Sequence, residues 1–223
     1  MIPAGGYLGK ILRIDLSSLK VCEEELSFKK IEKYVGGTGL GARYLYDEVP
    51  PGVEWNDPAN RLIFFSGPLG ATRISGTGTF SVLTKGPMTD LAGTSQANGL
   101  FGAYLKLAGF DGFIVQGAAP HWVYLFIQDG QGELRDARHL QGKGTFATEE
   151  ILLKELGLGH RGSVQCIGPA GENGVRFAMI SGDGGHVAAH NGMGAVMGSK
   201  RLKAIAVRGS RLPKPRDPEN SAH

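Results

Sequence analysis

The chain has 223 residues, little cysteine and no long apolar segment. Cys22 and Cys166 are its only cysteines, and they stand far apart in no Cys-x-x-Cys or Cys/His spacing. We interpret both as small apolar filler residues, because isolated cysteines usually behave in this way. Two cysteines cannot supply the four thiolates that an iron–sulfur cluster normally needs. This shortage argues against a cluster held by this chain alone.

An excess of either charge is also missing. Lys and Arg total 24 and Asp and Glu total 21, with no basic stripe, so the sequence offers no electrostatic case for nucleic acid. The apolar runs are far shorter than the roughly 18 residues that span a bilayer. Met1–Lys10 lacks the apolar core of a signal peptide. We therefore expect no nucleic acid partner, no membrane and a cytoplasmic location.

The common nucleotide-binding and catalytic motifs are absent as well. Gly192–Lys200 (GMGAVMGSK) has glycines too close together for a P-loop, and its Ser and Lys stand in reversed order. Gly37–Gly41 (GTGLG) does not fit the Gly-x-Gly-x-x-Gly pattern of dinucleotide-binding folds. No G-x-S-x-G, H-E-x-x-H or kinase set is present. These observations argue against a nucleoside triphosphatase and against a Rossmann-type site.

Glycine, by contrast, is abundant, at 36 of 223 residues. The glycines cluster at Gly36–Gly41, Gly67–Gly78, Gly168–Gly174 and Gly182–Gly198. Glycine is needed where φ is positive or where the backbone approaches another body closely. Two interpretations stay open: a backbone packed against a ligand, and a tightly wound β architecture.

The most informative feature is a segment that occurs twice. Phe101–Gly117 reads FGAYLKLAGFDGFIVQG, and Met193–Gly209 reads MGAVMGSKRLKAIAVRG. Without a gap, four pairs coincide: Gly102/Gly194, Ala103/Ala195, Val115/Val207 and Gly117/Gly209. Each copy predicts a helix that begins at Gly-Ala, followed by a buried strand that ends in Gly.

Three further pairs of segments recur in the same order. They are Lys10–Asp15 with Val123–Gln128, Gly36–Val49 with Lys143–Leu156, and Ser66–Gly70 with Ile167–Gly171. Any α/β protein repeats some strand–turn–helix pieces, but the common order favours an internal duplication. We predict an α+β fold with two β-sheets and short helices, related by a pseudo-two-fold axis. The lobes would span about 1–117 and 118–209, and residues 210–223 have a linker-like composition.

Hydrophobic periodicity predicts the individual elements. The predicted helices are Phe28–Tyr34, Gly39–Glu48, Gly99–Ala108, Thr148–Leu156 and a short one over Gly194–Met197. The predicted strands are Leu8–Leu16, Val21–Glu25, Arg61–Ser66, Phe80–Thr84, Gly112–Gly117, Trp122–Gln128, Glu133–Asp136, Ser163–Ile167, Val175–Ser181 and Ala204–Val207.

The most function-like loop is Gly182–Gly194 (GDGGHVAAHNGMG), which we expect to lead a strand into a helix N-terminus. Three interpretations stay open for His186 and His190: two surface histidines, a His-x3-His metal pair on a helical turn, or part of an anion cradle. The corresponding loop of the first half is Gly93–Gly102. Under pseudo-two-fold symmetry the two loops would face each other and form one composite site for two similar ligands, or for one ligand with two anionic arms.

Seven stretches carry a resemblance to a known family: Gly6–Asp15, Gly67–Leu69, Thr84–Pro87, Phe101–Asp111, Arg135–His139, Ile167–Asn173 and Gly192–Val207. On these the chain resembles the N-terminal domain of the tungsten- and molybdenum-dependent aldehyde:ferredoxin oxidoreductases and their relatives that reduce aromatic acyl-CoA esters. The resemblance implies a duplicated domain that carries the two pterins of a metal–bispterin cofactor on its paired β surfaces.

The resemblance also implies site residues. The pterin- and phosphate-binding positions correspond to Thr79, Gln96, Ala97, Asn98, Gly99, His186, Val187, Ala188, Ala189 and His190. A magnesium ion that bridges the two pterin phosphates would use the backbone carbonyls of Gln96 and Val187. The family usually has arginine where this chain has Thr79, His186 and His190, and asparagine at the position of Gln96. Neither threonine nor histidine reproduces the bidentate grip of arginine on phosphate.

We therefore expect the cofactor-cradling domain or subunit of an oxidoreductase that converts an aldehyde to a carboxylic acid. Electrons would pass to ferredoxin through a 4Fe-4S cluster on helical domains or a partner subunit, so we assign no catalytic residue to this chain. One alternative is a stand-alone structural or dimerising domain without a cofactor, and a homodimer fits that reading. A third is a small metal-binding protein that uses His186 and His190.

Overall fold

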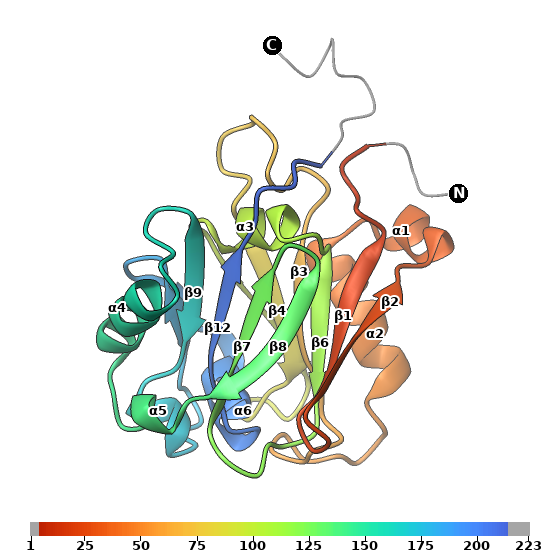
Figure 1. Cartoon of the computed structure of the whole chain (residues 1–223). Helices are drawn as coiled ribbons and strands as arrows, with labels where there is room; N and C mark the ends of the chain where they lie inside the picture. Colours follow the sequence, from red (N-terminus) through yellow and green to blue (C-terminus); the bar gives the residue numbers. More distant parts are fainter. Residues whose placement is uncertain (1–4, 214–223) are drawn as a thin grey trace.

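Two six-stranded sheets form the centre of the molecule, and helices cover their outer faces (Figure 1). The structure is a computed structural model that describes residues 5–213. Most of the predicted tail, 210–223, therefore lies outside the described residues. Within the described part, no helix is long and apolar enough to cross a membrane.

The first half contains six strands and three helices. The strands are β1 Lys10–Asp15, β2 Lys20–Glu25, β3 Leu62–Ser66, β4 Phe80–Lys85, β5 Ala92–Ala97 and β6 Gly112–Gln116. The helices are α1 Phe28–Tyr34, α2 Gly37–Glu48 and α3 Phe101–Leu107.

The second half repeats this course with six strands and three helices, and adds two 3₁₀ turns. Its strands are β7 Val123–Gln128, β8 Gln131–Asp136, β9 Gly162–Cys166, β10 Ile180–Gly182, β11 His186–Ala188 and β12 Leu202–Arg208. Its helices are α4 Thr145–Glu155, α5 Pro169–Glu172 and α6 Met193–Ser199, with 3₁₀ turns at Arg138–Leu140 and His190–Gly192. Unlike the first half, it has a short helix after β9 but none before α4.

The two sheets have the same strand order. The first runs β2-β1-β6-β3-β4-β5, and the second runs β8-β7-β12-β9-β10-β11, which is the same series advanced by six strands. The neighbours β1/β6 and β7/β12 are parallel, and all other neighbouring strands are antiparallel. The identical plan confirms the predicted α+β fold built from two related halves.

Alternating side chains divide the core into layers. In β3, Leu62 and Phe64 face the other sheet, whereas Ile63 and Phe65 pack with apolar residues of α1 and α2. In β12, Ile205 and Val207 face inward, and the neighbouring alanines pack under α4. The inner layer also holds apolar residues of α3 and α6. Period-2 alternation therefore buries both faces of each sheet.

The duplicated segment lies on equivalent elements, α3–β6 and α6–β12. The N–H of Gly102 donates to the carbonyl of Gly78, and the N–H of Gly194 donates to the carbonyl of Ala178, each at 2.9 Å. A Cβ on Gly102 would stand 2.5 Å from the Thr79 oxygen, and one on Gly194 would stand 2.4 Å from the Met179 oxygen. Both helix starts therefore need glycine for close backbone approach.

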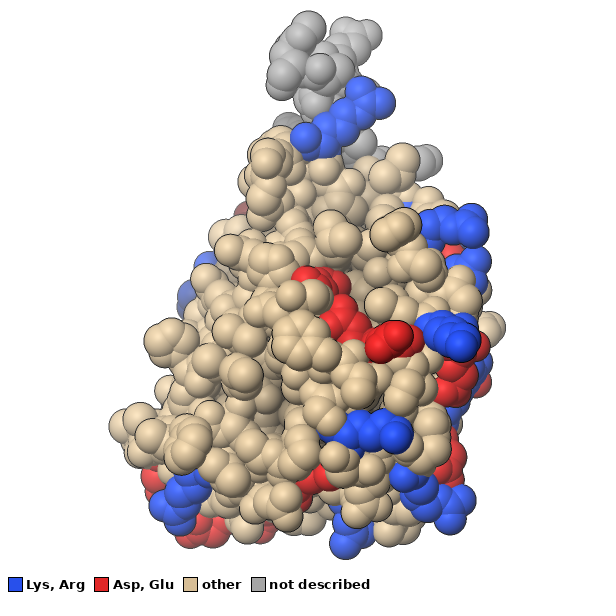
Figure 2. Space-filling view, turned by 90° about the vertical axis from the view of Figure 1, so that its left-hand side faces the viewer, with Lys and Arg blue, Asp and Glu red and all other residues tan. Residues whose placement is uncertain are grey.

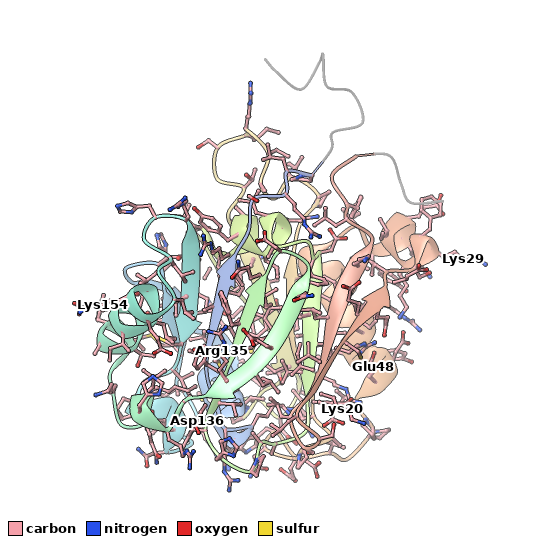
Figure 3. The ribbon with its side chains drawn as sticks, in the orientation of Figure 1. Lys20, Lys29, Glu48, Arg135, Asp136 and Lys154 are labelled. Atoms are coloured by element: carbon pink, nitrogen blue, oxygen red, sulfur yellow. The ribbon has the colours of Figure 1, made fainter. Side chains whose placement is uncertain are left out.

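Most charged side chains lie on the surface, as the labelled Lys29, Lys154 and Asp136 show (Figure 3). Three buried lysines, Lys106, Lys200 and Lys203, are exceptions, and two of them form buried ion pairs. Lys106 pairs with Asp111 in the first half, and Lys203 pairs with Glu172 in the second. Both pairs are shielded from solvent. Because a buried charge loses its hydration, it needs an opposite charge beside it, and in each pair the carboxylate provides one for the lysine.

Three predictions of secondary structure were wrong in the segments around β5, β10 and β11. Ala92–Ala97 and His186–Ala188 are strands rather than loops. Only the end of the predicted strand Val175–Ser181 is a strand, Ile180–Gly182. The preceding residues form a turn, in which the Ala178 N–H donates to the Val175 carbonyl at 2.8 Å. This turn leaves Phe177 and Met179 exposed instead of buried.

Candidate functional site

A cleft of about 520 Å³ opens between the start of α2, the loop between β3 and β4, and the β4–β5 edge. Its lining residues are Val35, Gly36, Gly37, Thr38, Gly39, Phe65, Gly67, Pro68, Leu69, Gly70, Ile74, Ser75, Gly76, Thr77, Thr79, Ser81 and Gln96. None of these side chains carries a formal charge, and six of the residues are glycine. The cleft therefore offers hydroxyl, amide and backbone groups to a ligand.

Polar side chains on one wall of the cleft are joined in a network. The Thr38 and Ser81 hydroxyls lie 3.1 Å apart, and the Gln96 amide donates to both at 3.3 Å. The alternation of β5 places Thr94 and Gln96 on this outer face, while Ser95 and Ala97 are buried. Thr94 joins the network through a 3.3 Å contact with Thr38.

The start of α2 lies beside this network, because Thr38 is its second residue. Gly36 is the N-cap residue, and no side chain caps this end. The first N–H groups of a helix have no intrahelical acceptor and favour an anion. A Cβ on Gly39 would stand 2.3 Å from the Tyr34 carbonyl oxygen, so the turn between α1 and α2 depends on glycine. The arrangement suits an anionic or strongly hydrogen-bonding group.

The resemblance-based residues fall at matching positions of the two halves. Gln96 in β5 pairs with Ser81 of β4, and Val187 in β11 pairs with Ser181 of β10. The next residues along the two strands, Ala97 and Ala188, are both buried. The two carbonyls suggested for magnesium therefore belong to equivalent positions.

The two halves meet where β5 contacts β11. The His190 N–H donates to the Ser95 hydroxyl at 3.1 Å. Thr79 donates to the Asn98 side chain at 2.9 Å. Gly99 has a φ of 105°, and a Cβ there would stand 2.5 Å from an Asp183 carboxylate oxygen. The structure thus brings the two groups of predicted residues to one seam, although Ala97 and Ala188 are buried within it.

A smaller cleft of about 370 Å³ lies at the same seam, on the side of α4. Its lining includes Gly99, Glu149, His160, Asp183 and His186. Burial, together with the negative charge of Asp183, raises the pKa of Glu149, although the Gly184 N–H donates to it at 3.0 Å. This cleft is acidic, unlike the uncharged cleft beside α2.

The two histidines do not have the arrangement that the metal-pair interpretation requires. His186 is an exposed strand residue, and His190 lies in the 3₁₀ turn that follows. Of the three interpretations left open for these histidines, the metal pair on one helical turn does not agree with this placement. Among residues 5–213, no group of three or more His, Cys, Asp or Glu side chains could hold a metal ion.

The glycine clusters Gly36–Gly41 and Gly67–Gly78 contain most of the cleft lining, in agreement with the ligand-contact interpretation that the sequence left open, but most of the polar side chains of the network were missed. Sequence reasoning identified Thr79 and Gln96 through the resemblance, but not Thr38, Ser81 or Thr94. The signal for Thr94 was the polar alternation in Ala92–Ala97, which is weak because the residues are small and poor in β-branched types. The cluster Gly36–Gly41 marked the segment that holds Thr38, but the contact of Thr38 with Ser81, 43 residues away, has no local signal.

Comparison with known proteins identifies the family. Residues 11–209 match the family described as "Aldehyde ferredoxin oxidoreductase, N-terminal domain". The chain belongs to this family. The resemblance stated from the sequence is therefore confirmed.

Several curated relatives are much longer proteins. The tungsten-containing aldehyde ferredoxin oxidoreductase of Pyrococcus horikoshii is 45% identical over 204 residues, covering 92% of this chain and 33% of the relative. The aliphatic sulfonate oxidoreductase, WOR-like subunit, of Pyrococcus furiosus is 39% identical over 223 residues, covering 92% of this chain and 35% of the relative. The chain thus spans about a third of the length of these relatives.

A solved structure has the same fold. It is the active site complex BamBC of benzoyl coenzyme A reductase in complex with 1,5 dienoyl-CoA. The TM-score is 0.90 at 42% sequence identity, covering 93% of this chain and 31% of the other. The fold is therefore shared over nearly the whole chain.

Proposed function

We propose that this chain is the cofactor-cradling part of a tungsten- or molybdenum-bispterin oxidoreductase that acts on aldehydes. The support is family membership together with one observation, the uncharged cleft where the start of α2 faces Thr79 and Gln96. The names of relatives favour tungsten. We propose domain limits of 1–209, with lobes of about 1–117 and 118–209, and a cytoplasmic location.

The residues of the first half fit a pterin phosphate. The N–H groups at the start of α2 offer donors to an anion, and the hydroxyls of Thr38, Thr79 and Ser81 offer further hydrogen bonds. The glycines around them allow close approach of the backbone. Backbone and hydroxyl donors would thereby take the place of the arginine that the family usually has at Thr79.

We propose that Gln96–Gly99 and His186–His190 border the cofactor along the seam between the halves. The carbonyls of Gln96 and Val187 would face a bridging magnesium ion. When bound, the cofactor supplies the two-electron redox chemistry, and this chain binds and orients it.

The other parts of the reaction require more protein than this chain. We propose that a further helical domain or partner subunit provides the 4Fe-4S cluster and the groups that act on the aldehyde. Ferredoxin would be the electron acceptor. The short length of the chain relative to its relatives supports this division.

Metal and pterin analysis of the protein purified from its native cells tests the proposal. We expect tungsten or molybdenum with two pterins per metal, and a strong loss of both in Thr38→Glu, because a carboxylate would repel an anion in the cleft. Ala147→Glu is the matched control, since Ala147 is exposed in the first turn of α4. Native protein without pterin or metal would instead support the cofactor-free structural or dimerising alternative.

A further inference from the structure

The second half presents an apolar surface where the first half has its polar cleft. Four polar residues that line the cleft have exposed apolar residues at their equivalent positions. The pairs are Thr38 and Phe146, Thr77 and Phe177, Thr79 and Met179, and Gln96 and Val187. We call Phe146, Phe177, Met179 and Val187 the apolar face.

Strand register establishes two of these pairs. Gln96 and Val187 each pair with the second residue of the preceding strand, which is a serine in both halves. Thr79 and Met179 each directly precede those strands, β4 and β10.

The other two pairs follow from neighbouring positions. Thr77 and Phe177 lie two residues before Thr79 and Met179, and Gly78 and Ala178 between them accept the equivalent hydrogen bonds from Gly102 and Gly194. Thr38 and Phe146 are the second residues of α2 and α4, and both helices follow a glycine N-cap.

Exposure of the apolar face is high. The exposed fractions are 67% for Phe146, 72% for Phe177, 44% for Met179 and 39% for Val187. These residues surround one corner of the second sheet: Met179 precedes β10, Val187 lies in β11, and the Phe146 ring lies 3.8 Å from where a Cβ on Gly185 would stand. Adjacent exposed apolar residues mark interaction sites more often than scattered ones do.

The fold itself does not require apolar residues at these four positions. The first half has threonine, threonine, threonine and glutamine there and keeps the same strand order and helix placement. Packing within this chain therefore does not explain the apolar face. A contact with another surface does, because burial of apolar area is the main favourable term in association.

The surroundings indicate what kind of surface fits. Figure 2 shows the side of the molecule with α4, where wide areas have no charged side chain and acidic side chains gather near the centre. Glu149 and Asp183 line the acidic cleft beside Val187 and its neighbour His186. A complementary partner has an apolar centre and Lys or Arg facing these carboxylates.

We propose that the apolar face is the docking surface for a partner subunit that completes the enzyme. This inference rests on the proposed function, in which such a polypeptide exists. The relatives support this occupant, because about two thirds of their length lies outside the region that this chain matches.

Site-specific photo-crosslinking in the native cells tests this assignment. A benzophenone amino acid is placed at Phe146, and at Phe28 as the matched control, because Phe28 is an exposed phenylalanine on α1 beyond the other sheet. We expect adducts from position 146 at more than tenfold the yield from position 28. Mass spectrometry should identify the attached peptide as the part of the family sequence that follows this domain. Adducts only between two copies of this chain, or equal yields, would overturn the proposal.

A second variant exchanges the apolar face for its first-half counterparts: Phe146→Thr, Phe177→Thr, Met179→Thr and Val187→Gln. We expect unchanged thermal stability, since the first half folds with these residues, and at least tenfold less co-purifying polypeptide. Undiminished co-purification would contradict the proposal. Pterin and metal are measured in the same preparations. Adducts without pterin would refute the proposed function alone, and pterin without adducts would refute only the docking surface.

Discussion

The carboxylate of Asp183 accepts a hydrogen bond of 2.7 Å from the backbone N–H of Leu100. The same oxygen accepts from the Phe101 N–H at 3.0 Å, and the other oxygen accepts from the Ser163 hydroxyl at 2.6 Å. A residue of the second half thus satisfies the free N–H groups at the start of α3 in the first half. Since this start directly follows the predicted site residues Asn98 and Gly99, the bond links the halves at the candidate site.

Replacement of Asp183 by alanine is expected to lower the free energy of unfolding by about 1.5–3 kcal/mol, as for hydrogen bonds to a charged group. Hydrogen exchange at the Leu100 and Phe101 amides should also accelerate. Asp15→Ala is the control, because Asp15 accepts from the N–H groups of Ser17 and Ser18 at an exposed turn within one half. Equal losses in the two variants would show that the link between the halves adds nothing.

The duplicated glycines give a symmetric prediction. Gly102→Ala and Gly194→Ala should each destabilise the protein by about 1–3 kcal/mol, the usual cost of overpacking, because the new Cβ would press on a backbone carbonyl. Gly144→Ala is the control, since no atom lies within 4 Å of a Cβ at that position. Urea denaturation measures the free energy of unfolding of all three variants. A neutral result at only one of the two sites would show that their packing differs.

Lys200 provides a test by pH. It is almost completely buried, and its ammonium donates to the carbonyls of Asn60 at 2.7 Å and Gly117 at 3.2 Å. Burial, with a smaller effect of the Arg61 charge, lowers the pKa of Lys200 to about 7. The unfolded chain holds this proton up to about pH 10.4. Between about pH 7 and pH 10.4 the unfolded chain therefore binds more protons than the folded protein. The free energy of unfolding should rise with pH over this range.

Lys200→Met removes this titration. The stability of the natural protein relative to the variant should increase by up to about 1.4 kcal/mol per pH unit between pH 7 and 10, and should be constant below about pH 6. Urea denaturation of both proteins at each pH gives the difference, and effects of other groups cancel. A difference that does not change with pH would show that Lys200 keeps its proton in the folded state.

Local patterns predicted the elements that have strong periodicity. The duplicated segment indicated α3–β6 and α6–β12, and the strand predictions Arg61–Ser66 and Ser163–Ile167 indicated β3 and β9. The pattern failed at β5 and β11, because small polar residues and a three-residue strand give little periodic signal. It also failed at Phe177 and Met179, whose apolar character suggested a buried strand. Their exposure follows from a turn that the sequence does not mark.

The sequence predicted that the loops Gly93–Gly102 and Gly182–Gly194 face each other, but not the individual contacts between the halves. Asp183 and Leu100 are far apart in the chain, and their contact depends on the placement of one sheet against the other. The buried pairs are similar: the duplicated segments align Asp111 with Lys203, so one position has opposite charges in the two halves. Each half supplies its own partner, Lys106 or Glu172. Pairing of this kind appears only when the fold is known.

Glu48, labelled in Figure 3, gives the last prediction. Its carboxylate accepts from Arg13 at 2.6 and 2.8 Å and from Arg61 at 3.1 Å. Burial alone would raise its pKa, but the two arginines, Arg13 first, outweigh burial, and the pKa of Glu48 is lowered. A lowered acid pKa stabilises the fold at pH values above the pKa of the unfolded chain, about 4.3. This stability is lost as the pH falls below that value and through the lowered pKa of the folded state.

Glu48→Gln should therefore lower the free energy of unfolding by about 1.5–3 kcal/mol at pH 7, with a smaller difference from the natural protein below about pH 4. Glu23→Gln is the control, because Glu23 pairs with Lys10 at an exposed site, where such pairs contribute about 0–1 kcal/mol. Thermal unfolding of the three proteins at pH 7 and at low pH separates these effects. A loss that is equal at both pH values would mean that Glu48 acts through its shape and hydrogen bonds, since the charge would then contribute nothing to the attachment of α2 to the first sheet.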